Sequence, residues 1–301
     1  NFKKTIHQFY PIDHIFITNK FLKYWKPKVA IFIESEIWPS MFNNLNQKKI
    51  PIILLNARLT KKTFNKWIQI KYFAKSIFEK ISIAYPQNNE TFTYLKSLKL
   101  KKLKMIGNLK FVENKEENLN KINKNLKLFL KRRKIWIASS THKNEEIICA
   151  KAHLELKKKY NDLTTIIIPR HVHRADEIMM KIKNLNLNVT KHSSAKKNLN
   201  KVDVYLVDTF GETKKFHNLA PTVFLGGSIA LKGGQNPLEA VRSGANILHG
   251  PHTDNFKDIY RLLKKLNITK KVYNSKDLAS SIVFKKNKIK GIKVKNIGVK
   301  V

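Results

Sequence analysis

The sequence predicts an α/β protein built from two domains, each with a parallel sheet. Short runs of β-branched residues alternate with longer amphipathic stretches along most of the 301 residues. The runs are apolar throughout, as expected for strands that are covered on both faces. They fall into two sets, separated by residues 112–134, where no strand signal occurs.

The individual elements follow from these patterns. Runs rich in Ile, Val and Thr predict strands at residues 29–33, 52–55, 81–85, 104–106, 135–139, 165–168, 204–207, 222–225 and 246–248. Apolar residues three or four positions apart predict helices at residues 62–80, 88–98, 143–160, 175–184 and 237–243. Because strands and helices alternate, neighbouring strands are expected to be parallel.

The two sets of strands define the expected domains. The N-terminal domain spans residues 1–112, the C-terminal domain spans residues 113–290, and residues 291–301 form a basic tail. The first residue is asparagine and not methionine, so a further segment is expected to precede it and to complete the first domain. Two such domains predict a central cleft, with ligands bound outside the carboxyl ends of the strands.

The chain is strongly basic, with a formal net charge of +39 and a pI of about 10.2. Seven of its 60 basic residues are arginine and 53 are lysine. AT-rich codon usage alone would produce this balance, and an anionic membrane surface would be a partner that makes use of it. A nucleic-acid partner is not expected, because such proteins rely more on arginine, whose planar fork reads phosphates and bases.

Cys149 is the only cysteine, which excludes an internal disulfide. Its apolar neighbours predict a buried thiol on a helix, as in proteins of reducing compartments. No apolar run approaches the length of about 20 residues that is needed to span a bilayer.

Polar residues follow three expected strands of the first domain. Glu34 and Glu36 come after the first strand, and carboxylates at i and i+2 of an extended chain point to one side, where crowding can hold a proton. The other interpretation is that Ser35 or Glu36 caps the next helix. Arg58 follows the second strand and would clamp a carboxylate or phosphate, or form a surface ion pair. Lys110 follows the fourth strand and would stand at the cleft.

Two segments of the second domain bring possible anion ligands to strand ends. The first, SSTHKNEE at residues 139–146, fits either a helix N-cap or an anion site at a helix start. The second, PRHVHR at residues 169–174, begins with Pro169 and Arg170 and fits a phosphate site. No cysteine or acid stands at a matching spacing, so a metal site is not expected.

Glycines follow two further strands of this domain. Thr209, Phe210 and Gly211 come after one strand, where the glycine permits a tight turn and the phenylalanine would stack on a base or simply pack. Gly227 and Ser228 come after another, within a stretch of nine residues that holds four of the ten glycines. Such a stretch lets the backbone approach a ligand closely.

The glycine-rich stretch leads directly into a helix start. Asn236 would cap the helix, and Pro237 would be its first residue, followed by Leu238. The free amides there would bind a phosphate, and Glu239 would accept hydrogen bonds from ribose hydroxyls. A purely structural turn is the alternative.

Ten of these segments, in this order, resemble the transferases of 3-deoxy-manno-octulosonic acid (Kdo) in Gram-negative lipopolysaccharide assembly. The resemblance covers roughly residues 8–265. The segments are FIESEIWPS, NARL, YPQNNET, GNLKF, SSTHKNEE, PRHVHR, DTFGE, FLGGS, GGQNPLEA and GPHTDNF.

The resemblance implies a GT-B-type fold, with CMP-Kdo in the C-terminal domain, a lipid A precursor facing the N-terminal domain, and no metal or other cofactor. It implies supporting roles at the reacting centre for Glu36, Glu34, Lys110 and Arg58. It implies that CMP is bound by Pro169, Arg170, Thr209, Phe210, Gly211, Gly227, Ser228, Asn236, Pro237, Leu238 and Glu239.

The catalytic base of the family is a glutamate in a Gly-Glu motif after a membrane-anchoring segment, and neither occurs here. The only acid before Glu34 is Asp13, which does not match. The resemblance therefore implies a chain that binds its donor without turning it over. It places the full-length protein at the cytoplasmic face of the inner membrane, peripheral or N-terminally anchored. The alternatives are a GT-B transferase that uses a UDP-sugar and a non-catalytic nucleotide-binding fragment.

Overall fold

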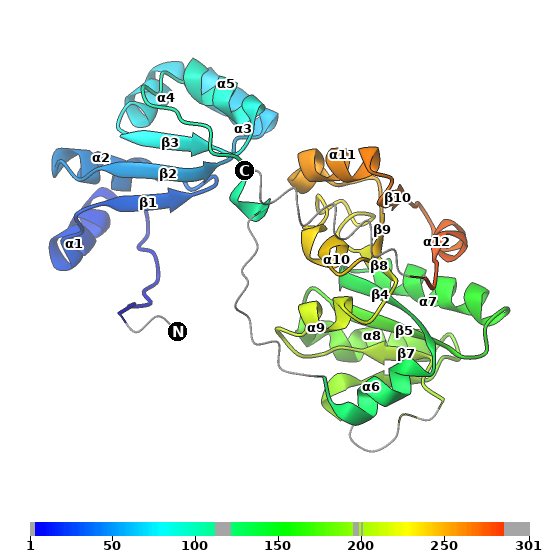
Figure 1. Ribbon diagram of the computed structural model, residues 1–301. Coiled ribbons are helices and arrows are strands. Elements are labelled where there is room, and N and C mark those ends of the chain that lie inside the picture. Colours follow the sequence, from blue (N-terminus) through cyan, green and yellow to red (C-terminus); the bar gives the residue numbers. More distant parts are fainter. Residues whose placement is uncertain (1–3, 112–121, 195–198, 200, 286–301) are drawn as a thin grey trace. The chain divides into compact units, whose positions relative to one another are not determined.

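The computed structural model describes residues 4–111, 122–194, 199 and 201–285 (Figure 1). The chain divides into two compact units, residues 1–113 and 114–300. Each unit contains one sheet, and every strand pair in both sheets is parallel. The expected fold class, α/β with two parallel sheets, is confirmed. The expected boundary at residues 112 and 113 and the basic tail at 291–301 lie outside the described residues.

Unit 1 has a three-stranded sheet with the order β1-β2-β3, covered by helices (Figure 1). Its core includes Phe42, Leu45, Leu54, Phe78 and Leu95, each at most 1% exposed. The elements are α1 (Ile15–Trp25), β1 (Ala30–Ile33), α2 (Pro39–Gln47), β2 (Ile52–Ala57), α3 (Lys61–Gln69), α4 (Lys71–Phe78), β3 (Ile83–Pro86), α5 (Asn89–Ser97) and the short helix η1 (Leu109–Phe111).

Unit 2 has a seven-stranded sheet with the order β10-β9-β8-β4-β5-β7-β6. Its helices are α6 (Lys124–Lys131), α7 (Glu145–Lys157), α8 (Ala175–Lys183), α9 (Thr213–His217), α10 (Leu238–Arg242), α11 (Lys257–Lys265) and α12 (Ser275–Ser281). Its strands are β4 (Lys134–Thr141), β5 (Leu163–Pro169), β6 (Val189–Lys191), β7 (Val204–Leu206), β8 (Thr222–Leu225), β9 (Asn246–His249) and β10 (Thr269–Lys271).

The central strands of unit 2 are buried on both faces, which explains their uninterrupted apolar sequences. All seven residues of β5 and all four of β8 are buried. Trp136 of β4 and Cys149 of α7 are fully buried in the same core cluster. The thiol is therefore internal and free, as expected, and burial raises its pKa well above the ordinary value.

The expected strand at residues 104–106 is wrong. In its place a single residue, Leu103, forms an isolated bridge to Ala84 of β3. The surrounding residues are lysines and other exposed or half-exposed side chains, and they supply no second buried position to extend the pairing.

Two expected helices differ from those observed. The stretch 62–80 forms two helices, α3 and α4, because the backbone leaves the helical region at Ile70 (φ −113°, ψ 47°). The helix expected at 237–243 is α10, which begins one residue later, with Pro237 at the N-cap position.

Candidate functional site

The loops that carry the expected donor residues leave one edge of the unit 2 sheet. In a parallel sheet all carboxyl ends lie along the same edge, where α/β proteins bind their ligands. β5 ends at Pro169, β7 at Leu206 and β8 at Leu225, so the segments that follow them start from that edge. We call it the carboxyl edge of unit 2.

Two side chains at this edge are open to solvent. Arg170 is exposed, while its backbone amide donates to the Thr141 carbonyl oxygen at 3.0 Å, which fixes the start of the loop. Phe210 is 79% exposed, which excludes the alternative that it simply packs. An exposed cation and an exposed ring can bind a phosphate and a base, respectively.

Three buried polar atoms at the carboxyl edge have no hydrogen-bond partner within the described part of the chain. They are Thr141 Oγ1, His142 Nε2 and Thr209 Oγ1. A buried polar atom without a partner costs about 1–3 kcal/mol, so such atoms are rare in proteins unless water or a ligand meets them. At the carboxyl edge these three atoms offer hydrogen-bonding capacity to a polar ligand.

His142 lies in cationic surroundings. Burial lowers its pKa, the nearby Glu145 opposes this shift, and His171, Lys232 and Arg170 lower the pKa further. These causes disfavour the protonated imidazole, and the positive charges of Lys232 and Arg170 favour an anionic ligand.

The residues expected to bind ribose and phosphate begin α10. The Asn236 Oδ1 accepts from the Leu238 amide at 3.1 Å, so its side chain caps the helix although it stands one position before the N-cap. Glu239 lies in the first turn with its side chain 44% exposed, and its carboxylate is 3.9 Å from the Lys214 ammonium. Both side chains remain accessible from the carboxyl edge.

Gly227 and Ser228 are placed differently from the simplest expectation. Their amides donate to the carboxylate of Glu145, at 2.7 and 3.1 Å, so these two groups are already bonded within the protein. The expected N-cap by Ser140 or Thr141 is wrong, since α7 starts after Asn144 without a side-chain cap. Sequence reasoning missed Glu145 as the partner of the glycine loop, because the contact spans more than 80 residues of sequence.

In unit 1 the structure brings Glu34 and Lys110 together. The Lys110 ammonium lies 2.6 Å from Glu34 Oε1, with both side chains partly exposed, at 25% and 32%. Glu34 adopts a left-handed backbone (φ 60°), and so does Asn56 at the end of β2 (φ 50°). The Asn56 Oδ1 accepts from the Leu109 amide at 3.1 Å, which holds the segment of Lys110 near the ends of β1 and β2.

Arg58 and Glu36 lie in the segments beside this ion pair. The Arg58 amide donates to the Glu34 carbonyl oxygen at 3.2 Å, and its own carbonyl accepts from the Ser35 hydroxyl at 2.7 Å. Glu36 Oε2 instead accepts from the Trp38 indole at 2.8 Å. Of the two expected carboxylates, Glu34 is the one that the structure pairs with a cation.

Helix α2 is capped by neither Ser35 nor Glu36, so that interpretation is wrong. Asp13, located 27 residues before Ser40, accepts from the amides of Ser40 (3.1 Å) and Met41 (2.8 Å). A carboxylate at a helix start also interacts favourably with the helix dipole. The acid that matched no expected motif is therefore a capping residue.

Neither a metal cluster nor a spanning helix is found among the residues that are described. No group of three or more His, Cys, Asp and Glu side chains could hold a metal ion. His171 and His173 lie with ring centroids 5.7 Å apart. No helix there is long and apolar enough to cross a membrane.

Solved structures share this fold. Trehalose-6-phosphate synthase OtsA matches with a TM-score of 0.56 and 10% identity, over 94% of this chain and 71% of that one. The C-terminal CMP-Kdo binding domain of WaaA from Acinetobacter baumannii matches with a TM-score of 0.50 and 24% identity, over 59% of this chain and 94% of that one. The two parallel sheets thus define a protein of the GT-B class.

Sequence comparison specifies the family. A family model described as 3-deoxy-D-manno-octulosonic-acid transferase (kdotransferase) matches residues 1–113. The 3-deoxy-D-manno-octulosonic acid transferase of Rickettsia typhi is 34% identical over 297 residues, which are 97% of this chain and 63% of the relative. That of Haemophilus influenzae is 31% identical over 278 residues, covering 90% of this chain and 64% of the relative. The chain is thus similar to Kdo transferases over almost its whole length, and it spans about three fifths of the length of these relatives.

Proposed function

We propose that this chain carries the donor site, and part of the acceptor side, of a glycosyltransferase that moves Kdo from CMP-Kdo to a lipid A precursor. The observation that carries the proposal is the carboxyl edge of unit 2, where an exposed cation, an exposed aromatic ring and three unpartnered polar atoms lie in the segments that match the family. The solved domain that resembles unit 2 is itself a CMP-Kdo binding domain.

In the proposed reaction a general base takes a proton from an acceptor hydroxyl, which attacks the anomeric carbon of Kdo while CMP leaves. Arg170 would hold the phosphate of CMP. Phe210 would lie on the cytosine ring, and Glu239 would accept from the ribose hydroxyls. No residue of this chain is assigned the role of general base.

The ion pair of Glu34 and Lys110 suits the charges that change in such a transfer. Glycosyl transfer passes through an oxocarbenium-like transition state, which a nearby carboxylate stabilises. A lysine ammonium would bind the carboxylate of an acidic sugar. The left-handed backbone at Glu34 is a strain of the kind that is found at functional sites.

The donor assignment predicts selective stabilisation by CMP. At about 100 times its Kd, a ligand adds about 2.7 kcal/mol to the stability of the folded state, a shift of roughly 5–10 °C for a unit of this size. We expect CMP to give such a shift in thermal unfolding and UDP to give none. The mutation Arg170→Ala should weaken CMP binding tenfold or more, because a charge-assisted hydrogen bond is lost.

Arg261→Ala is the matched control, because Arg261 is an exposed arginine on α11 that forms an ion pair with Asp258 at 3.7 Å. It should leave CMP binding unchanged. A shift with UDP and not CMP would favour the UDP-sugar alternative. No shift with either nucleotide, in protein shown to be folded, would contradict the donor assignment.

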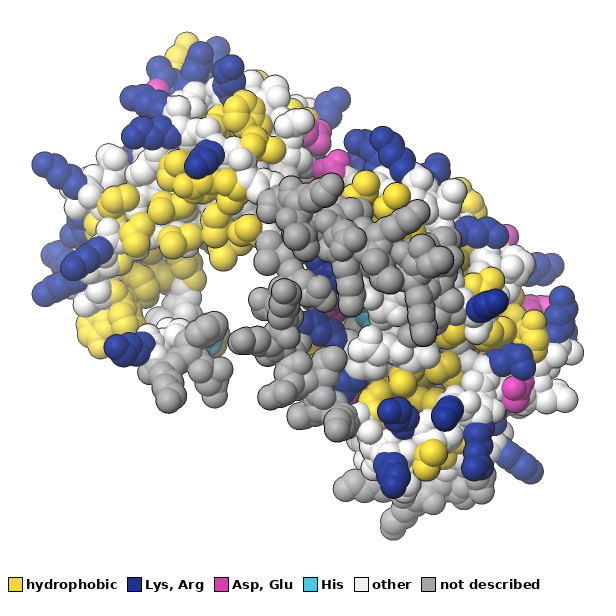
Figure 2. All heavy atoms as spheres, in the orientation of Figure 1, with side chains coloured by type: hydrophobic (Ala, Val, Ile, Leu, Met, Phe, Trp, Pro, Cys, Tyr) yellow, Lys and Arg dark blue, Asp and Glu magenta, His cyan; other side chains and the backbone are white. Residues whose placement is uncertain are grey.

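A membrane partner is supported by a surface that we call the α3–α4 surface. It combines exposed apolar side chains with lysines: Ile68, Ile70, Tyr72 and Phe73 are 40–90% exposed, and Lys66, Lys71 and Lys75 are exposed around them. Figure 2 shows hydrophobic and basic side chains next to one another on unit 1. Apolar rings together with lysines are typical of helices that lie in the interface of an anionic bilayer.

The α3–α4 surface predicts binding to anionic vesicles. We expect the chain to sediment with vesicles that contain phosphatidylglycerol and not with pure phosphatidylcholine, and added salt should reduce the binding. The double mutant Ile68→Ser, Tyr72→Ser should lower the bound fraction severalfold. Met180→Ser, which removes an apolar side chain that is 66% exposed on unit 2, should not. Equal loss in both variants would contradict the assignment of this surface.

A further inference from the structure

One carboxylate organises the glycine loop at the carboxyl edge of unit 2. Glu145, the first residue of α7, is 1% exposed and accepts from four successive amides of the loop after β8. The distances are 2.7 Å from Gly227, 3.1 Å from Ser228, 2.9 Å from Ile229 and 3.2 Å from Ala230. A fifth amide, that of His142, donates to it at 2.8 Å.

Successive amides that point to one place form an anion-binding concavity, as in phosphate-binding loops. Here that concavity is filled by a carboxylate of the protein. The fit is close, since a Cβ at Gly226 would lie 2.8 Å from Glu145 Oε2, and one at Gly227 would lie 3.1 Å from the His142 ring. The amides of this glycine loop therefore have no capacity left for a phosphate.

The loop is also fixed on its other side. The Ser228 hydroxyl accepts from the Gly250 amide at 2.8 Å, and the Ser228 carbonyl accepts from the His252 amide at 2.9 Å. The Gly227 carbonyl accepts from the Gly234 amide at 3.0 Å, two residues before Asn236. Glu145 thus determines the position of His142 on one side and of the approach to α10 on the other.

We propose that Glu145 is a positioning residue for the donor: it occupies the amide concavity of the glycine loop, directs the phosphate to Arg170, and holds His142 beside Gly227. This inference rests on the proposed donor site at the same edge. Its distinctive consequence is that removal of the side chain leaves an unoccupied anion site, which a small carboxylate can fill.

The test compares two adjacent buried carboxylates. Glu145→Ala should weaken CMP binding at least tenfold, and about 0.1 M acetate should restore most of the loss, because acetate can accept from the same amides. The CMP affinity of Glu145→Asp should lie between those of the wild type and Glu145→Ala. Glu146→Ala is the control, since Glu146 is 2% exposed but bonds the Arg174 guanidinium at 3.0 Å and not the loop. Glu146→Ala should lower the unfolding temperature. At a temperature where this variant is folded, its CMP affinity should equal that of the wild type.

Two outcomes would overturn the inference: unchanged CMP affinity in folded Glu145→Ala, or weakened affinity that acetate does not restore. Hydrogen exchange gives a reading that does not depend on CMP. The amides of Gly227 to Ala230 should exchange at least tenfold faster in Glu145→Ala and be protected again by acetate. Should the wild type fail to bind CMP, the proposed donor site falls, while the exchange data still decide whether Glu145 holds the loop.

Discussion

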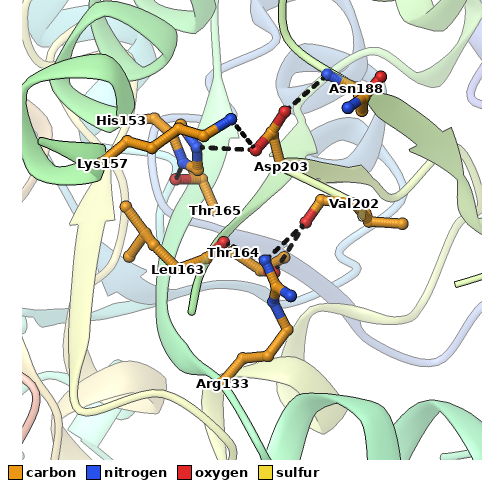
Figure 3. Close-up of polar contacts among 9 residues, drawn as sticks. All are labelled: Arg133, His153, Lys157, Leu163, Thr164, Thr165, Asn188, Val202 and Asp203. Atoms are coloured by element: carbon orange, nitrogen blue, oxygen red, sulfur yellow. Dashed lines mark hydrogen bonds and ion pairs between the residues drawn. The ribbon is translucent and has the colours of Figure 1, made fainter. Parts of the chain in front are cut away.

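Replacing Asp203 with asparagine is expected to lower the free energy of unfolding of unit 2 by about 3 kcal/mol, or roughly 5–10 °C in unfolding temperature. Asp203 lies before β7 and is 5% exposed. Its carboxylate accepts from the Lys157 ammonium at 2.6 Å and from the Asn188 amide at 2.9 Å, and it lies 3.6 Å from His153 Nε2 (Figure 3). Asparagine removes the charge and replaces one acceptor oxygen by a donor, which leaves either the Asn188 amide or the Lys157 ammonium without its acceptor.

The effect of this mutation should depend on pH. Burial alone would raise the pKa of Asp203, but the interactions with His153, Lys157 and the Asn188 amide outweigh it and hold the pKa far below the ordinary value. A carboxylate with a depressed pKa contributes stability above its unfolded pKa of about 3.9 and loses it as the pH falls toward the folded pKa. The difference in stability between wild type and Asp203→Asn should therefore be constant from about pH 6 to 8 and shrink below about pH 4.

Asp162→Asn is the matched control, measured by calorimetric unfolding under the same conditions. Asp162 pairs with Lys134 at 3.1 Å, but the two side chains are 48% and 38% exposed. Exposed ion pairs contribute about 0–1 kcal/mol, so this mutant should unfold close to wild type. If Asp203→Asn lost as little stability as Asp162→Asn, the buried cluster around Asp203 would not stabilise the sheet.

Local pattern was sufficient for most of the framework of this protein. The Leu163–Pro169 strand was recognisable because a strand buried on both faces must be apolar throughout. The same reasoning placed Arg170 and Phe210 at the carboxyl edge, since parallel strands end along one edge. It failed at residues 104–106, where β-strand composition was not accompanied by a second buried position.

The contacts that sequence reasoning missed join residues far apart in the chain. Asp13 caps α2 through the amide of Ser40, 27 residues later, and Glu145 binds a loop that begins more than 80 residues later. For the cap of α2, Ser35 was a local alternative that satisfies the same rules of capping. Only the three-dimensional path of the chain decides between partners that are chemically equivalent.

Gly226 is a further residue whose neighbours are distant in the sequence, and its replacement should destabilise unit 2 strongly. Gly226 was given no role from the sequence, and its close neighbour in the structure is the end of β4. A Cβ there would lie 2.5 Å from the Ser140 carbonyl oxygen and 2.6 Å from Thr141 Cα, and neither backbone atom can turn aside. Gly226→Ala should therefore lower the free energy of unfolding by about 3 kcal/mol or more, through forced separation of β4 and the glycine loop.

Gly211→Ala separates this effect from backbone strain. Gly211 has a positive φ of 79° and nothing within 4 Å of its would-be Cβ, so alanine there should cost only about 1–2 kcal/mol. Thermal unfolding of both variants decides the matter. A larger loss in Gly226→Ala means that close contact between backbones, and not left-handed geometry, makes glycine necessary beside Glu145. Equal losses would mean that β4 and the loop can move apart at little cost, and that Glu145 holds them less firmly than its five hydrogen bonds imply.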